Sequence, residues 1–301
     1  MFKKDLKIAV VGDLMLDRFV YGSVDRISPE APIPIFKTNG QVIETLGGAG
    51  NVLNNLLSLG YKADIIGSVG DDEVGDEISA YLWSKKINGT YLNINSGKYK
   101  SGLKVRYIAD GQHVVRIDSE EISPIEYPKK IDKFYDVTII SDYAKGNITK
   151  GILAKIIPRS EFIILDPHPD NKDIYSEFSV DLITPNNQEA VKLTNLQMGS
   201  LNSIIDISKK LRKYAQSSII TNGSDGMYVY EDKCMIRIPS EKVEVYDVSG
   251  AGDTVVAILA IALGSGLNLR ESAKLANKAA GIVVGKIGTA TVTMEELNGK
   301  S

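Results

Sequence analysis

Short apolar runs alternate with longer segments of helical periodicity along most of this 301-residue chain. Short runs rich in β-branched residues predict strands buried on both faces, whereas apolar residues spaced three and four apart predict helices. The predicted strands are Lys7–Val11, Ala63–Ile66, Val137–Ser141, Phe162–Asp166, Asp181–Thr184 and Ser218–Thr221. The predicted helices are Asn51–Leu59, Val74–Lys85, Thr149–Ile157, Ser203–Gln216, Thr254–Leu263 and Leu269–Val284. This alternation is typical of an α/β fold in which crossover helices join parallel strands.

Two segments of the chain depart from this alternation. Residues 18–45 and 90–118 contain stretches of alternating apolar and polar side chains, which is the period of a half-buried strand. The stretches are Ile33–Lys37, Gln41–Thr45, Tyr91–Asn95, Gly102–Ile108 and His113–Asp118. They predict a small second sheet beside the ligand crevice, either a lid or a dimer surface, with a pair of surface hairpins as the alternative. Because no repeat or low-complexity linker interrupts the sequence, residues 1–301 are predicted to form one domain that carries these strands as insertions.

The composition narrows the class of partner. Hydrophobic residues make up 43% of the chain, and the formal net charge is −3 with no basic tract. This balance supports a substantial core and favours small solutes over nucleic acid or a membrane surface. The only cysteine is Cys234 and the two histidines are far apart, so neither a disulfide nor a Cys/His metal cluster is expected. The longest apolar run, Val255–Leu263, is about half of a membrane span, and no signal-type segment begins the chain, so a cytoplasmic location is expected.

The motif Asp247–Thr254 reads Asp-Val-Ser-Gly-Ala-Gly-Asp-Thr and continues directly into an apolar helix pattern. The first N–H groups of a helix lack partners within the helix and carry the positive end of its dipole. Gly250, Ala251 and Gly252 can therefore bring backbone donors against a phosphoryl group. Asp253 falls in the same turn, where it can take a proton from an attacking hydroxyl. The alternative is a glycine-rich turn, capped by its serine, before a core helix.

A second glycine-rich motif, Gly47-Gly48-Ala49-Gly50-Asn51, precedes a predicted helix. Adjacent glycines let the backbone approach a ligand, and Asn51 can donate and accept hydrogen bonds to a pair of hydroxyls. The motif is not a dinucleotide-binding fingerprint, because Leu53 occupies the position of the third glycine. A plain tight turn is the alternative.

Two acidic residues, Asp13 and Asp17, follow the first predicted strand. Open α/β sheets bind ligands beyond the carboxyl ends of their strands, and a carboxylate there can accept hydrogen bonds from sugar hydroxyls. Taken alone, either acid is more typical of a helix or turn cap than of a sugar site.

The two glycine-rich motifs resemble, in order and separation, the two signatures of the ribokinase-type (pfkB) family of sugar kinases. The resemblance covers essentially the whole chain, through Thr184–Glu189, Thr221–Gly226 and Asn277–Gly288. It implies a three-layer α/β/α sandwich with a mostly parallel sheet and a small β-sheet lid. It also implies ATP and Mg²⁺ as cofactors, with a monovalent cation such as K⁺ as a further option.

The resemblance also assigns residues to roles. Those assigned to phosphoryl transfer are Asp253, Gly250, Ala251 and Gly252. Those assigned to the nucleotide are Asn186, Glu189, Thr221, Gly223, Gly226, Asn277 and Gly288, with Glu189 near Mg²⁺ through water. Those assigned to the sugar are Asp13, Asp17, Gly47, Gly48, Asn51, Arg106, Asp142 and Lys145.

Within the family, three longer strings are similar to the heptose 7-phosphate kinases, which occur alone or as half of a bifunctional kinase/adenylyltransferase. The strings are Arg26–Pro34, Ser141–Gly146 and Val283–Val292. Two positions depart from the pattern: Gly50 replaces the usual alanine, and His168 stands where a lysine is usual. Because a lysine there can bind a substrate phosphate, its absence leaves the exact sugar phosphate open.

The predicted function is ATP-dependent phosphorylation of O1 of D-glycero-D-manno-heptose 7-phosphate, in ADP-heptose biosynthesis, by a homodimer joined through the lid strands. The chain lacks a Gly-x-x-x-x-Gly-Lys-Ser/Thr loop and protein-kinase motifs, so phosphate handling falls to the helix start at Gly250. Candidates for the phosphate already on the sugar are Lys145, Lys104, Arg106 and Arg116. The alternatives are another kinase of the family, of ribokinase or fructokinase type, and a non-catalytic sugar-phosphate-binding protein.

Overall fold

The computed structural model describes residues 2–87, 91–95, 99–123, 125, 131–240, 244–286 and 288–299. Its centre is a nine-stranded sheet in the order β13-β12-β11-β10-β9-β8-β1-β4-β5. The strands are β1 (Ile8–Gly12), β4 (Ala63–Gly70), β5 (Tyr91–Asn95), β8 (Tyr135–Ser141), β9 (Ser160–Asp166), β10 (Val180–Ile183), β11 (Ala215–Thr221), β12 (Met227–Glu231) and β13 (Cys234–Ile238). Neighbouring strands are parallel except at the β11–β12 and β12–β13 pairs.

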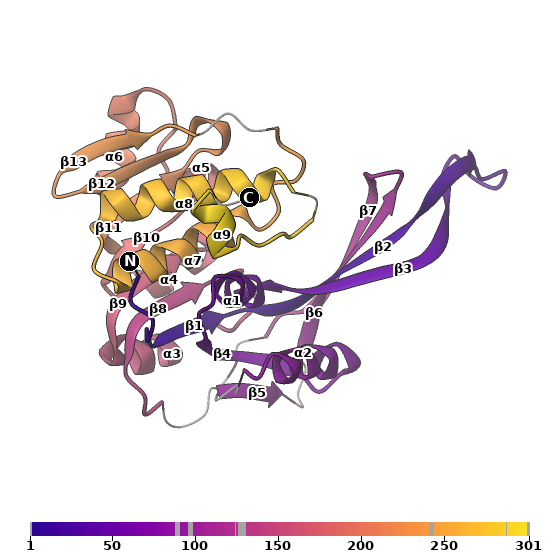
Figure 1. The fold of residues 1–301 in the computed structure, drawn as a ribbon, viewed down its shortest axis with the longest axis horizontal. Coiled ribbons are helices and arrows are strands. Elements are labelled where there is room, and N and C mark those ends of the chain that lie inside the picture. Colours follow the sequence, from indigo (N-terminus) through magenta and orange to yellow (C-terminus); the bar gives the residue numbers. More distant parts are fainter. Residues whose placement is uncertain are drawn as a thin grey trace.

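Helices cover both faces of this sheet and complete a three-layer α/β/α fold (Figure 1). One face packs against α1 (Ala49–Ser58), α2 (Glu73–Ser84), α7 (Ala251–Gly264), α8 (Leu269–Val284) and α9 (Met294–Leu297). The other packs against α3 (Lys150–Ile156), α4 (Lys172–Tyr175), α5 (Asn187–Thr194) and α6 (Leu201–Leu211). In β1, Ile8 and Val10 enter the first core while Ala9 and Val11 enter the second. The predicted runs are continuously apolar because both faces of each strand are buried.

A second sheet projects from this body as a long arm, and we call it the lid (Figure 1). It has the order β3-β2-β6-β7, with β2 (Leu14–Ile27), β3 (Pro34–Gly48), β6 (Lys100–Ala109) and β7 (Gln112–Glu121). Strands β2 and β6 are parallel, whereas the two outer pairs are antiparallel. The predicted small sheet is therefore present, and the alternative of two independent hairpins is wrong.

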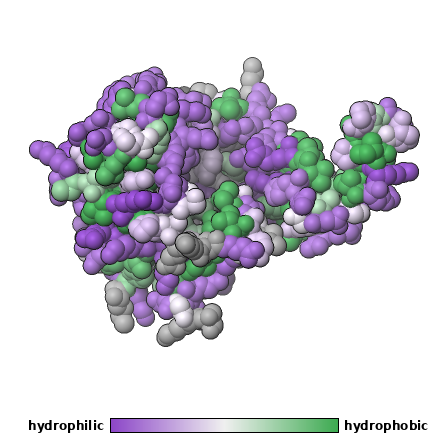
Figure 2. Space-filling model, turned by 90° about the horizontal axis from the view of Figure 1, so that it is seen from above, coloured by the Kyte–Doolittle hydropathy of each residue, from purple (hydrophilic) through white to green (hydrophobic). Residues whose placement is uncertain are grey.

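Side-chain alternation gives the lid two different faces. Asp17, Lys104 and Asp118 lie opposite one another in register, and Phe19, Arg106 and Arg116 form the next row on that same face. We call this the charged face. The row on the opposite face consists of Val42, Val20, Tyr107 and Val115. We call that the apolar face, and Figure 2 shows hydrophobic patches on the projecting lid.

Several boundaries differ from the sequence predictions. Tyr91–Asn95 is not a lid strand, because β5 pairs with β4 at the edge of the large sheet. The helix predicted to reach Gln216 ends at Leu211, where the chain turns into the buried strand β11. Residues Gly47 and Gly48 end the long strand β3 directly before α1, so the alternative of a plain tight turn is wrong.

Several elements of the large sheet and its surroundings were not predicted from the sequence. These are α4, α5, α9, β12 and β13. Within the described residues, no helix combines the length and apolar character needed to cross a membrane.

Candidate active site

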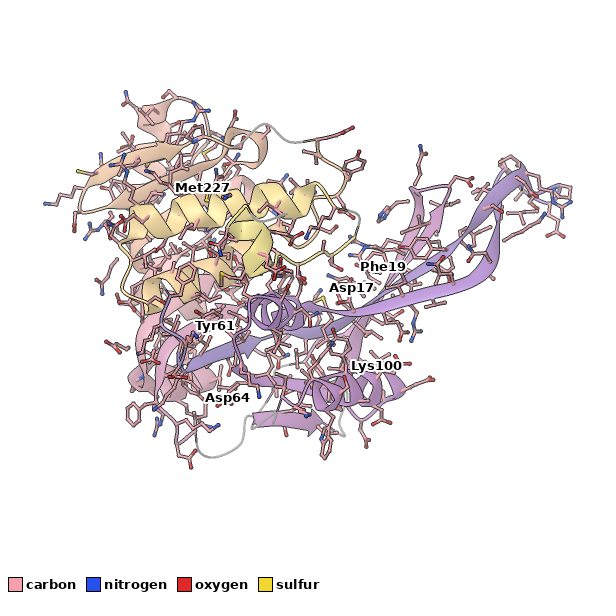
Figure 3. The ribbon with its side chains drawn as sticks, viewed as in Figure 1. Asp17, Phe19, Tyr61, Asp64, Lys100 and Met227 are labelled. Atoms are coloured by element: carbon pink, nitrogen blue, oxygen red, sulfur yellow. The ribbon has the colours of Figure 1, made fainter. Side chains whose placement is uncertain are left out.

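The carboxyl ends of the central parallel strands meet the start of α7, as expected for a ligand crevice in an open α/β sheet. Asp13 follows β1, Asp142 follows β8 and Asp166 ends β9. Asp17 lies inside the lid strand β2 and not in the turn after β1. Figure 3 places Asp17 and Phe19 where the lid leaves the body. The root of the lid adjoins the carboxyl end of β8, since the ammonium of Lys104 on β6 lies near the ring of Tyr143.

The start of α7 has the form of an open anion site. Its N-cap is Gly250, with φ of 79° and no side-chain cap, so the alternative of a helix capped by Ser249 is wrong. A Cβ at Gly250 would lie 2.5 Å from the amide nitrogen of Asn51, and the left-handed backbone favours glycine here. The N–H of Ala251 donates to the carbonyl of Val248 at 3.3 Å. By contrast, a Cβ at Gly252 would meet nothing within 4 Å, so free space lies over the helix start.

Asp253 is buried in the first turn of α7, with 5% of its surface exposed. The amide of Asn51 donates to one of its carboxylate oxygens at 2.7 Å, and the hydroxyl of Tyr143 donates to the other at 2.9 Å. Burial raises the pKa of Asp253 to about 6, although these two hydrogen bonds oppose the rise. The carboxylate is therefore ionised at neutral pH yet basic enough to accept a proton.

Asn51 has an unused acceptor beside this carboxylate. Its amide nitrogen is held by Asp253, while its side-chain oxygen is buried and has no hydrogen-bond partner within the described residues. A buried acceptor without a partner is costly, so a ligand hydroxyl donating to it is the natural way to satisfy it.

Asp13 is completely buried, and it organises the loop that follows β8. Its carboxylate accepts from the backbone N–H groups of Tyr143 at 2.8 Å, Lys145 at 3.1 Å and Asn147 at 3.0 Å. Its own carbonyl accepts from Ala49 N–H at 3.0 Å, which links the loop to the start of α1. The structure thus brings Asp13 into the site and shows its carboxylate engaged by backbone donors.

Asp142 lies beside Asp13 and is also engaged. Its carboxylate accepts from Ala144 N–H and from the amide of Asn171, each at 2.7 Å, and from the hydroxyl of Tyr175. Burial and the neighbouring Asp13 raise the pKa of Asp142 to about 7.

The predicted ligands of the sugar's phosphate differ in whether their side chains already form an ion pair with an acidic residue. Arg106 is buried and ion-paired with Asp17, and a Cβ at Gly47 would collide with that carboxylate. Two further predicted phosphate ligands are also paired: Lys145, in the loop after β8, with Glu120, and Arg116 of β7 with Asp118. Lys104 makes no hydrogen bond or ion pair in the part of the chain that the structure describes, and its ammonium lies 5.7 Å from the ring centroid of Tyr143. Burial lowers the pKa of Lys104, so an anionic ligand would be a favourable partner.

A cavity of about 390 Å³ lies between β11, β12, α7 and α8. It is lined by Thr221, Gly223, Gly226, Gly252 and Asn277, together with apolar side chains such as Val255, Ala280 and Val284. An apolar slot with a few polar groups at its rim suits a nucleotide base. Gly288 is not among the described residues that line this cavity. The methyl group of its neighbour Thr289 instead lies 3.6 Å from a Cβ placed at Gly250, near the start of α7.

A smaller cavity of about 240 Å³ adjoins the first at Thr221, Gly252 and Val255. Its acidic lining comprises Asp142, Asp166 and Glu189, with Asn186 and His168 beside them. Asn186 and Glu189 cap α5 reciprocally, since each side chain accepts from the backbone N–H of the other. Burial, and secondly the charges of Glu189 and Asp253, raise the pKa of Asp166 well above its usual value. A divalent cation beside Glu189 would relieve this crowding of carboxylates, so the residues fit the predicted Mg²⁺.

Two residues of the site escaped the sequence analysis. The only sequence signal for Asp166 was its position at the end of a predicted strand. The only signal for Tyr143 was its position next to Asp142, in the string Ser141–Gly146 that is similar to the heptose 7-phosphate kinases. Among the described residues, no three His, Cys, Asp or Glu side chains lie close enough together to hold an ion by themselves. Water or phosphate oxygens would have to complete the coordination.

Comparisons with known proteins agree with this geometry. The profile of the pfkB family carbohydrate kinases matches residues 5–297. The chain is 41% identical to the bifunctional protein HldE of Aliarcobacter butzleri over 99% of its own length, and 40% identical to that of Nitratiruptor sp. over 97%. It spans only 64% of the length of each of these relatives.

Solved structures share the fold at low sequence identity. The ribokinase of Thermotoga maritima superposes with a TM-score of 0.74 at 19% identity, covering 98% of this chain and 99% of its own. Phosphofructokinase-2 of Escherichia coli, in complex with substrates and products, gives a TM-score of 0.74 at 16% identity, covering 98% of each chain.

Proposed function

Because this chain belongs to the pfkB family of carbohydrate kinases, we propose that it transfers a phosphoryl group from ATP to O1 of D-glycero-D-manno-heptose 7-phosphate. The product would be the 1,7-bisphosphate, a precursor in ADP-heptose biosynthesis. The observation that carries the proposal is the position of Asp253: buried at the open start of α7, facing the lid and beside the nucleotide-sized cavity. The heptose subgroup rests on the strings that resemble it and on the HldE relatives.

Each residue of the site has a separate role in the proposed phosphoryl transfer. Asp253 would take the proton of the attacking hydroxyl, and the buried oxygen of Asn51 would accept from a neighbouring hydroxyl. The backbone N–H of Gly252 would stabilise the charge on the transferring phosphoryl group. Mg²⁺ at Glu189, held through water, would neutralise ATP oxygens when bound. The apolar cavity around Asn277 would hold the base.

The phosphate already on the sugar needs a cation, and Lys104 is the best placed. Its ammonium forms no close ion pair within the described residues, although Asp17 and Asp118 lie opposite it in register, whereas Lys145 is paired with Glu120 and Arg106 with Asp17. Lys104→Met is expected to lower kcat/KM for the phosphosugar about 100-fold, since a charge-assisted hydrogen bond is lost, with KM for ATP unchanged. Lys145→Ala should cost less, because the substrate must compete with Glu120.

Steady-state kinetics of both variants measure these losses. The matched control is Lys100→Met, an exposed lysine at the start of the same strand β6, which should leave all parameters unchanged. Equal losses for phosphorylated and free sugar would argue against a phosphate-binding role for either lysine.

The substrate itself is tested by a coupled ADP-release assay with heptose 7-phosphate, free heptose, ribose and fructose. The expected result is turnover of heptose 7-phosphate far above the three unphosphorylated sugars, because the phosphate anchors the sugar for transfer at O1. Efficient turnover of ribose or fructose would instead assign the chain to another sugar kinase of the family.

A monovalent cation would also find an oxygen near the helix start. The hydroxyl of Thr289 is buried without a hydrogen-bond partner in the described part of the chain, and its methyl group lies 3.6 Å from the Cβ position of Gly250. A related fold, phosphofructokinase-2 of Escherichia coli, has been solved in complex with potassium. We therefore include K⁺ among the proposed cofactors.

We also propose a homodimer joined through the lids. Val42 and Val115 on the apolar face are each 49% exposed, and the edge strands β3 and β7 have no further strand beside them in the described sheet. Such edges and faces invite pairing with a second copy. Sedimentation velocity should give a dimer for the wild type and a monomer for Val42→Lys/Val115→Lys.

The control for this experiment is Trp83→Lys, which changes an 84% exposed apolar residue on α2 and should leave the dimer intact. A fully active wild-type monomer at all concentrations would contradict the lid-to-lid assembly.

A further inference from the structure

We infer that Tyr143 is a positioning residue that holds the carboxylate of Asp253 for proton transfer, an inference that rests on Asp253 being the base of the proposed kinase reaction. Tyr143 has the geometry for this role, since its hydroxyl donates to Oδ1 of Asp253 at 2.9 Å. The amide of Asn51 donates to Oδ2 at 2.7 Å. With a donor on each oxygen, the carboxylate cannot rotate freely, and each oxygen still has a lone pair for the substrate proton.

The backbone around Tyr143 is itself held in place. Asp13 accepts from the N–H of Tyr143 and from two further N–H groups of the same loop. Ala144 has a φ of 56°, a left-handed conformation that alanine rarely adopts, so surrounding contacts must impose it. Asp13 therefore fixes the loop, the loop fixes Tyr143, and Tyr143 fixes Asp253.

The charged groups around the pair come from three elements. Asp17 and Lys104 face it from the lid strands β2 and β6, and Asp166 faces it from β9. The ammonium of Lys104 lies over the ring of Tyr143. Burial and the charge of Asp253 raise the pKa of Tyr143 well above its usual value, so the phenol stays protonated and remains a donor at neutral pH.

Tyr143→Phe removes the hydroxyl and keeps the ring. We expect kcat to fall about 10-fold with an unchanged KM for ATP, because the freed carboxylate is no longer held toward the substrate. The lost hydrogen bond stabilised the charged carboxylate, so the acid limb of kcat/KM should move to higher pH by about half to one unit. A purely structural role for Tyr143 would not shift this limb.

The matched control is Tyr214→Phe. Tyr214 is a buried tyrosine whose hydroxyl also makes a hydrogen bond: it donates to the carbonyl of Leu193 at 3.4 Å, in the second core. The same chemical change outside the site should leave kcat and the pH profile as in the wild type.

The titration of Asp253 can be followed without any substrate, by ¹³C NMR of protein labelled at the aspartate side-chain carboxyl carbons. The Asp253 resonance is assigned by its absence in Asp253→Asn. Because this readout does not depend on the sugar, failure of the heptose proposal would leave the test intact. A raised midpoint together with a reduced kcat in Tyr143→Phe supports the inference, and an unchanged midpoint or an unchanged kcat would overturn it.

Discussion

Asp253→Asn is expected to lower kcat about 10²–10⁴-fold while the affinity for ATP stays near that of the wild type. The asparagine keeps the size of the side chain and can still accept from Asn51 or Tyr143, so the hydrogen-bonded frame is retained. What is lost is the group that takes the proton of the attacking hydroxyl. Initial rates measure kcat, and calorimetric titration with ATP measures binding.

The pH dependence of the wild type gives an independent check on this role. The pKa of Asp253 is raised to about 6 by burial, so the base is protonated below that pH and free above it. The value of kcat/KM should therefore rise as the pH increases through about 6 and then level off. Near-normal turnover by Asp253→Asn would remove Asp253 from the mechanism.

Gly252→Val is expected to lower kcat/KM at least about 100-fold without destabilising the fold, since one or two methyl groups would occupy the space where the phosphoryl group must lie. A Cβ at Gly252 meets no atom within 4 Å, and valine is no worse than glycine inside a helix. The melting temperature should therefore stay within about 1 °C of the wild type, which is the effect of a fraction of a kcal/mol in a domain of this size.

Gly250→Ala is the matched comparison two residues earlier. This position has a φ of 79°, and the new Cβ would lie 2.5 Å from the Asn51 amide, so both backbone strain and a collision are expected. Its melting temperature should fall by about 3–6 °C, corresponding to about 2–4 kcal/mol in a domain of this size. Activity in Gly252→Val equal to the wild type would show that phosphate does not use the start of α7.

The sequence predicted the body of the fold well because its signals are local. Strands buried on both faces appear as continuous apolar runs, and the helix Leu269–Val284 begins and ends as its periodicity predicts. The predicted end of the helix before β11 was wrong. The polar residues there are compatible with either a helix or a strand, and the pairing of β11 with β10 decides between the two. Strand β5 was misassigned because alternation predicts a strand but not the sheet it joins.

The candidate site, too, was predicted from the sequence only in part. The glycine-rich start of α7, with Asp253 in its first turn, follows from the sequence because helix-start chemistry depends on adjacent residues. Which basic residue of the lid is available to an anion does not follow, because Lys104, Lys145 and Arg106 all read as charged residues in strands or loops. Their availability depends on Glu120 and Asp17, which the strand register and the loop after β8 bring to them.

The sequence by itself determined the α/β class, the family resemblance and the two glycine-rich motifs of the candidate site. Only the tertiary structure decided that Tyr143 and Asn51, 92 positions apart in the chain, hold the two oxygens of one carboxylate. It also decided that the lid turns its charged face to the site and its apolar face away from it. The physical reason is that hydrogen bonds and ion pairs depend on distances of a few ångströms, which the folding of the sheets sets between residues that no local pattern connects.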